Sequence, residues 1–512
     1  MVTNSLGRQL PETFFGKKVQ PYEDPYNRKP VGNQATRHLR RHNPGDNKLL
    51  SNLREAIEAS GLKNGMCIAT HHHLRNGDAL LNLVVREIDR MGLRDIRIAS
   101  SSIHPVHAEL IPFIRKGVIS GFECGVNGLI GEMVSRGEID CPIIVRTHGG
   151  RARSLITGEV VVDVAFIAAP SCDRYGNMNG FFGPSACGSL GYAFTDAQYA
   201  RCVVAVTDNL TAAPVAPVSI SQALVDYVVQ VDTLGDPRKI VSTTTQVTRD
   251  PVGLQIARYA AQVIDASGLL RDGFSFQTGA GGISLAVAEQ VRRMMSQAQI
   301  KGSFGCGGIT GYFVDMLEEG LFRTLFDVQC FDLKAVESIG RNLHHQEMSA
   351  DTYANPFNAG AMVNLLDCVI LGATEIDVNF NVNVNTESNG YLLHNTGGHS
   401  DAAAGAKLSI ITAPLLRGRL PIIRDTVTTV TTPGRTIDVI VTERGIAVND
   451  HQRELKQELI RRKIPVRDIQ DLRAEACRIT GEPLPVEFTD EVVALIEYRD
   501  GTIIDAVRKV KE

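Results

Sequence analysis

Residues 163–179 read Asp-Val-Ala-Phe-Ile-Ala-Ala-Pro-Ser-Cys-Asp-Arg-Tyr-Gly-Asn-Met-Asn, and they align without a gap onto residues 367–383, Asp-Cys-Val-Ile-Leu-Gly-Ala-Thr-Glu-Ile-Asp-Val-Asn-Phe-Asn-Val-Asn. The positions that coincide are Asp163/Asp367, Ala169/Ala373, Asp173/Asp377, Asn177/Asn381 and Asn179/Asn383. Each copy is an apolar run that ends in an Asp/Asn turn, which is typical of a buried strand followed by a polar loop. The pair therefore predicts two related α/β domains that arose by internal duplication.

Other segments follow nearly the same offset. Residues 65–78 correspond to residues 273–282, and residues 99–103 correspond to residues 305–309. In both halves an expected strand enters a loop of small residues and a helical pattern follows, which is a repeated βα arrangement. We divide the chain into an irregular N-terminal arm (1–47), a first α/β domain (48–232) and a second α/β domain (233–512).

Several local patterns support this division. An amphipathic helix with Leu53 and Ile57 on its apolar face opens the first domain, and a helical pattern over 252–266 opens the second. A strand is expected at 436–441, helical structure over 453–478, and a closing strand and hairpin over 492–510. The arm is rich in Arg, Lys, Asn and Pro, and we expect it to lie over the body or over a neighbouring subunit.

Composition excludes several classes of protein. The chain has 512 residues and a net charge of −4, and no basic cluster is interleaved with aromatics, so nucleic acid is not an expected partner. It shows no membrane-spanning run and no signal-peptide pattern, so we expect a cytoplasmic protein. The ten cysteines form no close pair and should be reduced. His71, His72 and His73 are adjacent, which points neighbours to opposite faces of a strand, and no metal site is predicted.

Three glycine-rich loops follow expected strands of the second domain, at residues 277–282, 305–308 and 396–399. Glycine lets a backbone approach a ligand closely and presents N–H groups to an anion or to a developing oxyanion. The common nucleotide and hydrolase motifs are absent from the sequence, since neither GxGxxG, GxxxxGK[ST], HExxH nor GxSxG occurs. The loops therefore favour a crevice for a bulky, anionic ligand that those motifs do not bind.

The turns at Asp173 and Asp377, the loop at 277–282, Gly397-Gly398 and the stretch 441–447 together resemble the CoA-transferase superfamily. Within it, the stretches 100–103, 147–151, 170–173, 187–192 and 481–490 resemble the citrate lyase α-subunit family, over nearly the whole chain from about residue 48. The resemblance implies two CoA-transferase-like α/β domains and the transfer of an acyl-carrier thioester from acetate to citrate.

The same resemblance implies the partners. They are citrate, a β (lyase) subunit and a γ (acyl carrier) subunit, with the α chain itself a homo-oligomer within the complex. The thioester substrate would be acetyl-CoA or the dephospho-CoA-type prosthetic group of the carrier. No cofactor would be held tightly by this chain.

The resemblance also bears on mechanism. Many CoA-transferases use a Glu nucleophile, which in the branch with a loop like 279–282 follows that loop. Here no carboxylate occurs between Glu289 and Asp315, and Ser303 lies about where that Glu is expected. This gap favours direct attack of a citrate carboxylate on the thioester through a mixed anhydride. The alternatives are a CoA-transferase for another acid with Glu387, in the stretch 386–390, as nucleophile, or a mainly structural scaffold subunit.

The expected site residues fall into two groups. Oxyanion stabilisation and positioning are expected from Gln277, Gly281, Gly282, Gly307 and Gly308. Citrate carries up to three negative charges, for which guanidinium groups are geometrically suited. Substrate binding is expected from Arg75, Arg146, His148, Arg151, Gly397 and Gly398, with His71 and His72 as further groups that orient a carboxylate or hydroxyl.

Overall fold

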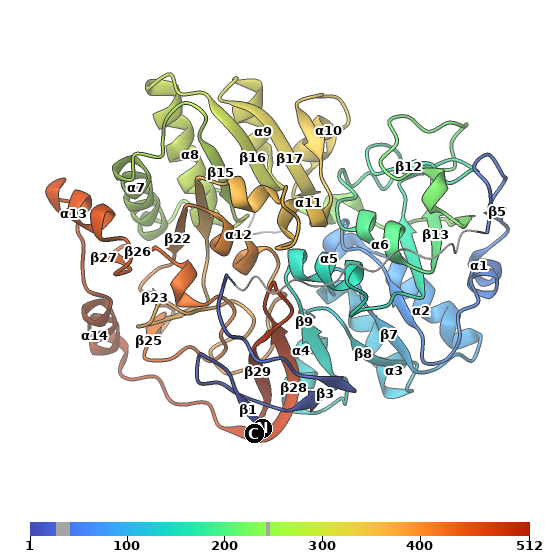
Figure 1. Cartoon of the computed structure of the whole chain (residues 1–512), viewed down its shortest axis with the longest axis horizontal. Coiled ribbons are helices and arrows are strands. Elements are labelled where there is room, and N and C mark those ends of the chain that lie inside the picture. The colour runs from blue at the N-terminus through green and yellow to red at the C-terminus, as the bar shows by residue number, and fades with distance from the viewer. Residues whose placement is uncertain (27–40, 242–245, 512) are drawn as a thin grey trace.

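The computed structural model describes residues 1–26, 41–241 and 246–511. Two large sheets, each flanked by helices, stand side by side, and the two ends of the chain meet between them (Figure 1). Residues 27–40 of the predicted arm lie outside the described residues.

The first sheet has ten strands, and all neighbours are parallel except the last pair along the chain, β28 and β29. Its central strands are buried along their whole length, as expected for a parallel sheet covered on both faces. In spatial order the strands are β29 (Ile503–Val510), β28 (Phe488–Glu497), β9 (Ile143–Val145), β8 (Ile119–Phe122), β7 (Ile96–Ile98), β6 (Cys67–Ala69), β10 (Val164–Ala168), β13 (Cys202–Thr207), β14 (Tyr227–Gln230) and β5 (Leu49–Leu50). The helices of this half are α1 (Leu53–Ser60), α2 (Leu80–Arg90), α3 (Ile111–Arg115), α4 (Leu129–Arg136), α5 (His148–Ile156) and α6 (Ala193–Tyr199).

The second sheet has eight strands and is parallel except for its last strand, β27. In spatial order the strands are β18 (His345–Glu347), β17 (Phe322–Cys330), β16 (Gly302–Ile309), β15 (Ser275–Thr278), β19 (Cys368–Leu371), β22 (Leu408–Thr412), β26 (Val439–Thr442) and β27 (Gly445–Val448). The helices are α7 (Pro251–Ala266), α8 (Gly282–Gln297), α9 (Gly311–Glu318), α10 (Leu333–Ile339), α11 (Ala350–Ala354), α12 (His399–Gly405), α13 (Arg453–Arg461) and α14 (Ile469–Thr480). The helices expected over 252–266 and 453–478 are confirmed, the latter as two helices.

Short ribbons and single turns complete the fold. The ribbons are β1 (Val2–Thr3) with β2 (Gln9–Leu10), β3 (Thr13–Phe14) with β4 (Lys17–Lys18), β11 (Ser171–Cys172) with β12 (Met178–Asn179), β20 (Glu375–Asp377) with β21 (Val382–Asn383) and β25 (Ile423–Arg424), and β23 (Leu416–Arg417) with β24 (Leu420–Pro421). The 3-10 turns are η1 (Arg75–Gly77), η2 (Pro105–Leu110), η3 (Gln222–Leu224), η4 (Pro237–Ile240), η5 (Met362–Leu365) and η6 (Gly434–Thr436).

The internal duplication is visible in individual hydrogen bonds. The side chain of Asp163 accepts a hydrogen bond from the backbone N–H of Cys67 at 2.9 Å, and Asp367 accepts one from Ser275 at 3.0 Å. In both halves this bond ties the start of one central strand to the start of the next. The later Asp of each copy accepts hydrogen bonds from the backbone and the side-chain amide of the Asn four residues on. The repeat thus specifies the same strand junction and the same turn twice.

The C-terminal hairpin crosses back to the first half of the molecule. Strand β28 pairs in parallel with β9, so that Ala494 lies opposite Ile143. Residues 488–510 therefore belong to the first sheet, although the predicted boundary assigned them to the second domain. A hairpin reveals its alternation in the sequence but not the sheet edge that it covers. The remaining boundaries of the division stay a prediction.

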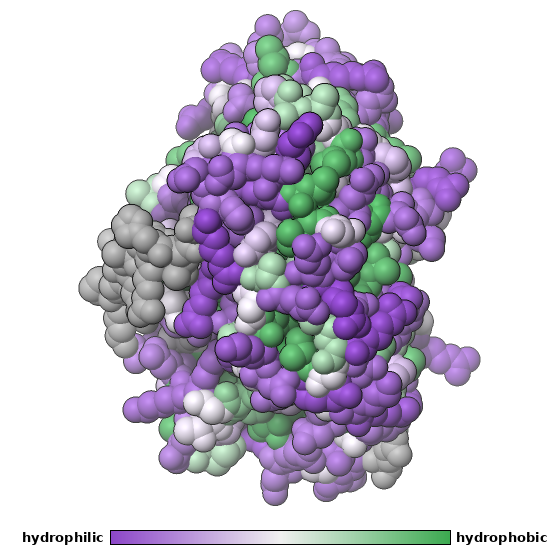
Figure 2. Space-filling model, turned by 90° about the vertical axis from the view of Figure 1, so that its right-hand side faces the viewer, coloured by the Kyte–Doolittle hydropathy of each residue, from purple (hydrophilic) through white to green (hydrophobic). Residues whose placement is uncertain are grey.

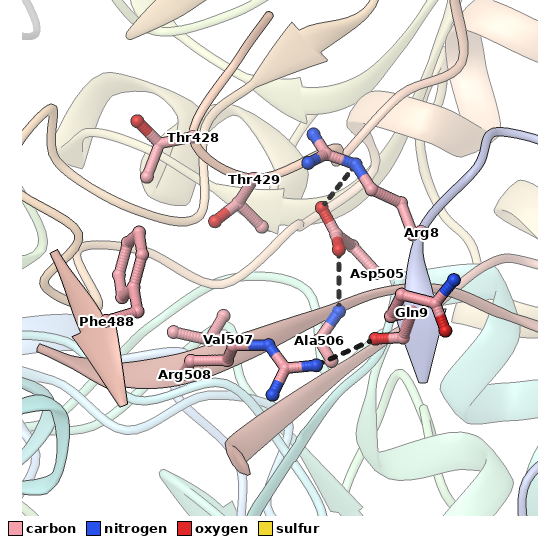
Figure 3. Close-up of a pocket in the computed structure, with 9 residues that line it drawn as sticks. All are labelled: Arg8, Gln9, Thr428, Thr429, Phe488, Asp505, Ala506, Val507 and Arg508. Atoms are coloured by element: carbon pink, nitrogen blue, oxygen red, sulfur yellow. Dashed lines mark hydrogen bonds and ion pairs between the residues drawn. The ribbon is translucent and has the colours of Figure 1, made fainter. Parts of the chain in front are cut away.

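The described part of the N-terminal arm packs on this hairpin. Asn4 donates its side-chain amide to the Ile504 carbonyl at 2.6 Å, and Tyr22 meets Tyr498 edge to face at 5.1 Å. Figure 3 shows Arg8 beside Asp505, and Arg508 donating to the backbone of Gln9, around a small cavity. The arm therefore lies over its own chain and holds the hairpin in place.

The surface hydropathy, the helices and the cysteines complete the description of the fold. Figure 2 shows the end of the molecule at the first domain, where a band of apolar side chains runs between broad hydrophilic areas. Among the described residues, no helix is long and apolar enough to cross a membrane. All ten cysteines are free, and nine of them are buried.

Candidate active site

The loops at the carboxyl ends of the two sheets face each other across the interface between the domains. The backbone N–H of His148, which follows β9, donates to the Gly397 carbonyl at 2.9 Å. The side-chain amide of Gln329, at the end of β17, donates to the His72 carbonyl, which follows β6, at 3.0 Å. Ligands of open α/β sheets bind at such ends, so the candidate site is this interface.

A buried group of aromatic and imidazole rings forms the wall on the first domain. His72 stacks on Tyr192 at 4.7 Å between centroids, and His148 lies 4.5 Å from the same ring. His104 lies 5.2 Å from His72. The Tyr192 hydroxyl is 3.0 Å from His148 Nε2 and donates to Gln329 Oε1 at 3.3 Å. We call His72, His104, His148 and Tyr192 the ring cluster, and it joins the two domains through Gln329.

The imidazoles of this region are neutral at pH 7. Burial, and after it the nearby Arg151 charge, lowers the pKa of His148 to about 3. The pKa of His104 is likewise lowered to about 3, first by burial. Burial also holds the pKa values of His71, His72 and His73 well below the usual range. A neutral imidazole offers one N–H donor and one nitrogen acceptor, so these rings can bind hydroxyl or carboxyl groups without a charge of their own.

Three of these imidazoles have ring nitrogens without a hydrogen-bond partner among the described residues. Both ring nitrogens of His71 and of His73, and Nε2 of His104, are buried and make no hydrogen bond to any described residue. Buried polar atoms are nearly always hydrogen-bonded in folded proteins. The unpaired nitrogens therefore mark a place where a polar ligand or water would bind.

The wall on the second domain is organised around Tyr353. Gln277 donates its amide to the Tyr353 hydroxyl at 2.8 Å. A Cβ on Gly398 would lie 2.3 Å from that hydroxyl, and a Cβ on Gly307 would lie 2.9 Å from the Gln277 carboxamide carbon. Gly307 also has φ of +99°, which only glycine adopts readily. These glycines are thus needed for the close approach of Gln277 and Tyr353.

The other predicted glycines have different surroundings. Gly281 is exposed at the start of α8, where no side chain caps the helix and a Cβ would meet nothing within 4 Å. A Cβ on Gly282 would lie 2.8 Å from the Gln246 carbonyl oxygen, and one on Gly308 would lie 2.1 Å from the Phe331 ring. Gly281 therefore borders open space at a helix N-terminus, whereas Gly282 and Gly308 are required by packing.

The three predicted arginines differ in whether a carboxylate of the protein pairs with them. Arg151 pairs with Asp196 through two contacts of 2.8 Å and donates to the Ala99 carbonyl. Arg146 pairs with Glu123 and Glu497. Arg75 is half-buried, lies 5.1 Å above the Phe331 ring and has no carboxylate partner among the described residues. Burial lowers its pKa, but a guanidinium remains charged at pH 7. Arg75 is therefore the predicted cation whose charge is open to a ligand.

The comparison with known proteins decides the family. Residues 46–510 match the profile of the family described as citrate lyase, alpha subunit. The citrate lyase alpha chain of Klebsiella pneumoniae is 48% identical over 465 residues, which cover 91% of this chain and 92% of that protein. The alpha chain of Haemophilus influenzae is 46% identical over 468 residues, 91% and 94% of the two chains. This chain belongs to the citrate lyase α-subunit family.

Solved structures agree. A crystal structure described as the alpha subunit of citrate lyase from Streptococcus mutans in complex with citrate is 46% identical, has a TM-score of 0.96 and covers 99% of this chain and 100% of that one. The alpha subunit of a malonate decarboxylase from Acinetobacter baumannii is 14% identical, with a TM-score of 0.63 over 86% of this chain and 93% of that one, and so shares the fold alone. The CoA-transferase-like fold and the transferase class expected from the sequence are confirmed.

Tyr353 and Asp401 also belong to the candidate site, although the sequence analysis did not name them. Tyr353 lies 76 positions from Gln277, so no local pattern announces their contact. Asp401, on α12, accepts hydrogen bonds from the Thr147 hydroxyl and the Gly149 N–H, both at 2.9 Å. Burial raises the pKa of Asp401 to about 6. Through these bonds the second domain holds the first turn of α5, which carries His148.

Glu387, the alternative nucleophile, lies at the surface. Glu387 is exposed in a turn, where its backbone N–H donates to the Tyr391 carbonyl and its own carbonyl accepts from Gly390. Among the described residues there is no group of three or more His, Cys, Asp or Glu side chains that could hold a metal ion.

Proposed function

We propose that this α subunit transfers the acyl-carrier thioester from acetate to citrate, with release of acetate. The observation that carries the proposal is the interface between the domains, where Arg75 lies near His72 and His104 of the ring cluster and where His104 Nε2 has no hydrogen-bond partner among the described residues. A tricarboxylate needs both kinds of partner, since a cation offsets its charge and neutral donors or acceptors orient its hydroxyl and carboxyl groups. The related Streptococcus mutans protein has been crystallised with citrate, which supports the substrate.

The transfer is proposed to be direct. One carboxylate oxygen of citrate attacks the acetyl thioester carbon, the C–S bond breaks and the thiolate leaves, giving a mixed anhydride. The thiolate then attacks the citryl carbonyl of the anhydride, the C–O bond to that carbonyl breaks and acetate departs with one oxygen from citrate. Two positions argue for this route: Glu387 is exposed in a surface turn, and Asp401 is occupied by Thr147 and Gly149.

The protein supplies positioning and electrostatics in this scheme. Correct placement of carboxylate and thioester can lower the barrier by several kcal/mol, roughly up to 7–11 in the best intramolecular cases. We assign oxyanion stabilisation to the N–H groups at Gly281 and Gly282, because α8 begins there without a side-chain cap. Gln277, Gly307 and Gly308 are proposed to shape the wall beside them, and Gly397 and Gly398 to hold His148 and Tyr353. Arg75 and His148 are proposed to bind citrate, while Arg151 acts through the charge that it presents to His148.

The thioester is proposed to reach the site on acetyl-CoA or on the prosthetic group of the γ carrier subunit. The β subunit would then cleave citryl thioester, and the α chain would form a homo-oligomer inside the complex. These partners follow from the family and would be tested by co-purification.

The experiment is to incubate the purified chain alone with acetyl-CoA and citrate and to follow acyl-CoA species by mass spectrometry. Citryl-CoA and acetate without oxaloacetate are expected, because cleavage belongs to the partner. If the chain transferred CoA to another acid but not to citrate, the CoA-transferase assignment would stand and citrate would be rejected as the substrate. A Glu387→Gln variant is expected to keep full activity, and hydroxylamine with acetyl-CoA present should not inactivate the enzyme at that residue.

A further inference from the structure

A cavity of about 350 Å³ lies beneath the β3–β4 ribbon of the N-terminal arm, against the β9 and β28 edge of the first sheet. Its charged lining consists of Lys17 and Lys18 from the arm and Arg146, Glu159 and Glu497 from the body. Phe14, Val19 and Leu495 form much of its apolar wall. The volume suits a small organic molecule.

The charges around the cavity do not cancel. Glu123 lies within salt-bridge distance of Lys17 (2.7 Å), Arg97 (3.3 Å) and Arg146 (2.8 Å). Glu497 pairs with Arg146 and with Arg153, each at 3.1 Å, and Glu159 pairs with Arg153 at 2.5 Å. Four cations thus face three carboxylates before Lys18 is counted. Every carboxylate in the network has a cation of its own, and the excess is positive.

Arg146 is the cation of this network that still has free N–H donors. Its Nε donates to both Glu497 oxygens, and its Nη1 donates to the Glu123 carboxylate and carbonyl. Its third nitrogen, Nη2, makes no hydrogen bond to any residue in the described ranges, although only 3% of the side chain is exposed. Nη2 carries two N–H groups and is not among the fully buried atoms that lack a partner, so these donors are open to a ligand that enters the cavity.

We propose that this cavity binds a small aliphatic carboxylate, with its oxygens on Arg146 Nη2 and its chain against Phe14, Val19 and Leu495. This goes beyond the transferase function, because the cavity is formed by the arm and the hairpin rather than by the loops that face each other between the domains. A carboxylate bound in this cavity would still affect the proposed active site. Arg146 immediately precedes Thr147, whose hydroxyl caps α5 and donates to Asp401.

The test uses butanoate as the probe and the full-length chain as the protein. Isothermal titration should show saturable binding to the wild type. Val19→Phe should weaken it by about tenfold or more, because the larger ring fills the cavity. Val2→Phe, in the same arm but outside the cavity lining, should leave the affinity unchanged. Arg146→Gln should abolish binding, and Val19→Phe keeps the test decisive should that variant not fold.

A crystal structure with 4-bromobutanoate locates the probe. An anomalous bromine peak between Val19 and Leu495, with the carboxylate on Arg146, is expected. The proposal would be overturned by no saturable binding, by equal affinity of wild type and Val19→Phe, or by a bromine peak confined to the interface between the domains.

Discussion

At the scale of single residues, Tyr192 is the side chain whose hydroxyl joins the two walls of the site. It lies 3.0 Å from His148 Nε2 and donates to Gln329 Oε1. Tyr192→Phe removes that link and keeps the ring. A lost hydrogen bond of a buried polar group costs about 1–3 kcal/mol, so kcat should fall by roughly 10- to 100-fold.

The control for this variant is Tyr199→Phe, at the other end of the same helix. Steady-state kinetics of both variants, together with their thermal unfolding, check the prediction. Equal activity of Tyr192→Phe and Tyr199→Phe would remove the ring cluster from the mechanism.

Gly398 provides a second test at this scale. Gly398→Ala places a Cβ 2.3 Å from the Tyr353 hydroxyl and should displace Tyr353 from Gln277. Such overpacking typically costs 1–3 kcal/mol of stability, and we expect loss of activity as well. Gly372→Ala meets nothing within 4 Å and serves as the matched control. Chemical unfolding and activity assays on the pair should separate them, and two identical variants would show that Tyr353 tolerates displacement.

At the scale of elements, the N-terminus of α8 carries the oxyanion proposal. Gly281 has φ of −73°, which proline adopts, and a Cβ at this position would meet nothing within 4 Å, so we test Ala and Pro there. Only Pro lacks the N–H. Gly281→Pro should lower kcat by about 10²–10³, whereas Gly281→Ala should act like the wild type.

Rapid-quench measurement of citryl-CoA formation compares the two variants with matched folding controls by circular dichroism. If Pro and Ala at position 281 gave the same rate, the Gly281 N–H would have no part in the chemistry.

Elements also show what could be predicted from sequence. The strand junctions at Asp163 and Asp367 were predictable because the same residues recur at a fixed offset and make the same bonds. The glycine loops were predictable because close approach demands glycine, as at Gly307. The sequence could not show that Arg75 alone of the three predicted arginines lacks a carboxylate partner in the described residues. The partners of Arg146 and Arg151 are distant in the chain: apart from Glu123, they lie 45 or more positions away.

At the scale of the whole molecule, Asp401 links the domains and predicts a pH effect. Its pKa is raised to about 6, so the unfolded chain releases this proton at lower pH than the folded chain does. Stability contributed at this residue is therefore lost as pH rises through 6, by about 3 kcal/mol over the full titration.

Asp401→Asn cannot ionise and should lack this loss. Relative to the wild type, the variant should gain roughly 1 kcal/mol of unfolding free energy between pH 5 and pH 7.5. Urea unfolding across that range measures the difference. Parallel stability curves for the two proteins would show that Asp401 does not titrate in this way.

The whole molecule also sets the limit of sequence reasoning. Two α/β domains follow from local patterns, but the order of the strands, the return of β28 to β9 and the closure of the arm over it depend on tertiary contacts. The contacts of Asp401 with Thr147 and of Gln329 with His72 arise only when the two domains dock. The proposed active site therefore exists only in the assembled pair of domains.

The most direct test of the central claim is a single turnover with enzyme in excess, acetyl-CoA, and citrate labelled with ¹⁸O in its carboxylates. Direct transfer through a mixed anhydride predicts citryl-CoA together with acetate that has gained one ¹⁸O. Citryl-CoA accompanied by unlabelled acetate would mean that an enzyme carboxylate supplied the oxygen, and the absence of citryl-CoA would contradict the transferase assignment itself.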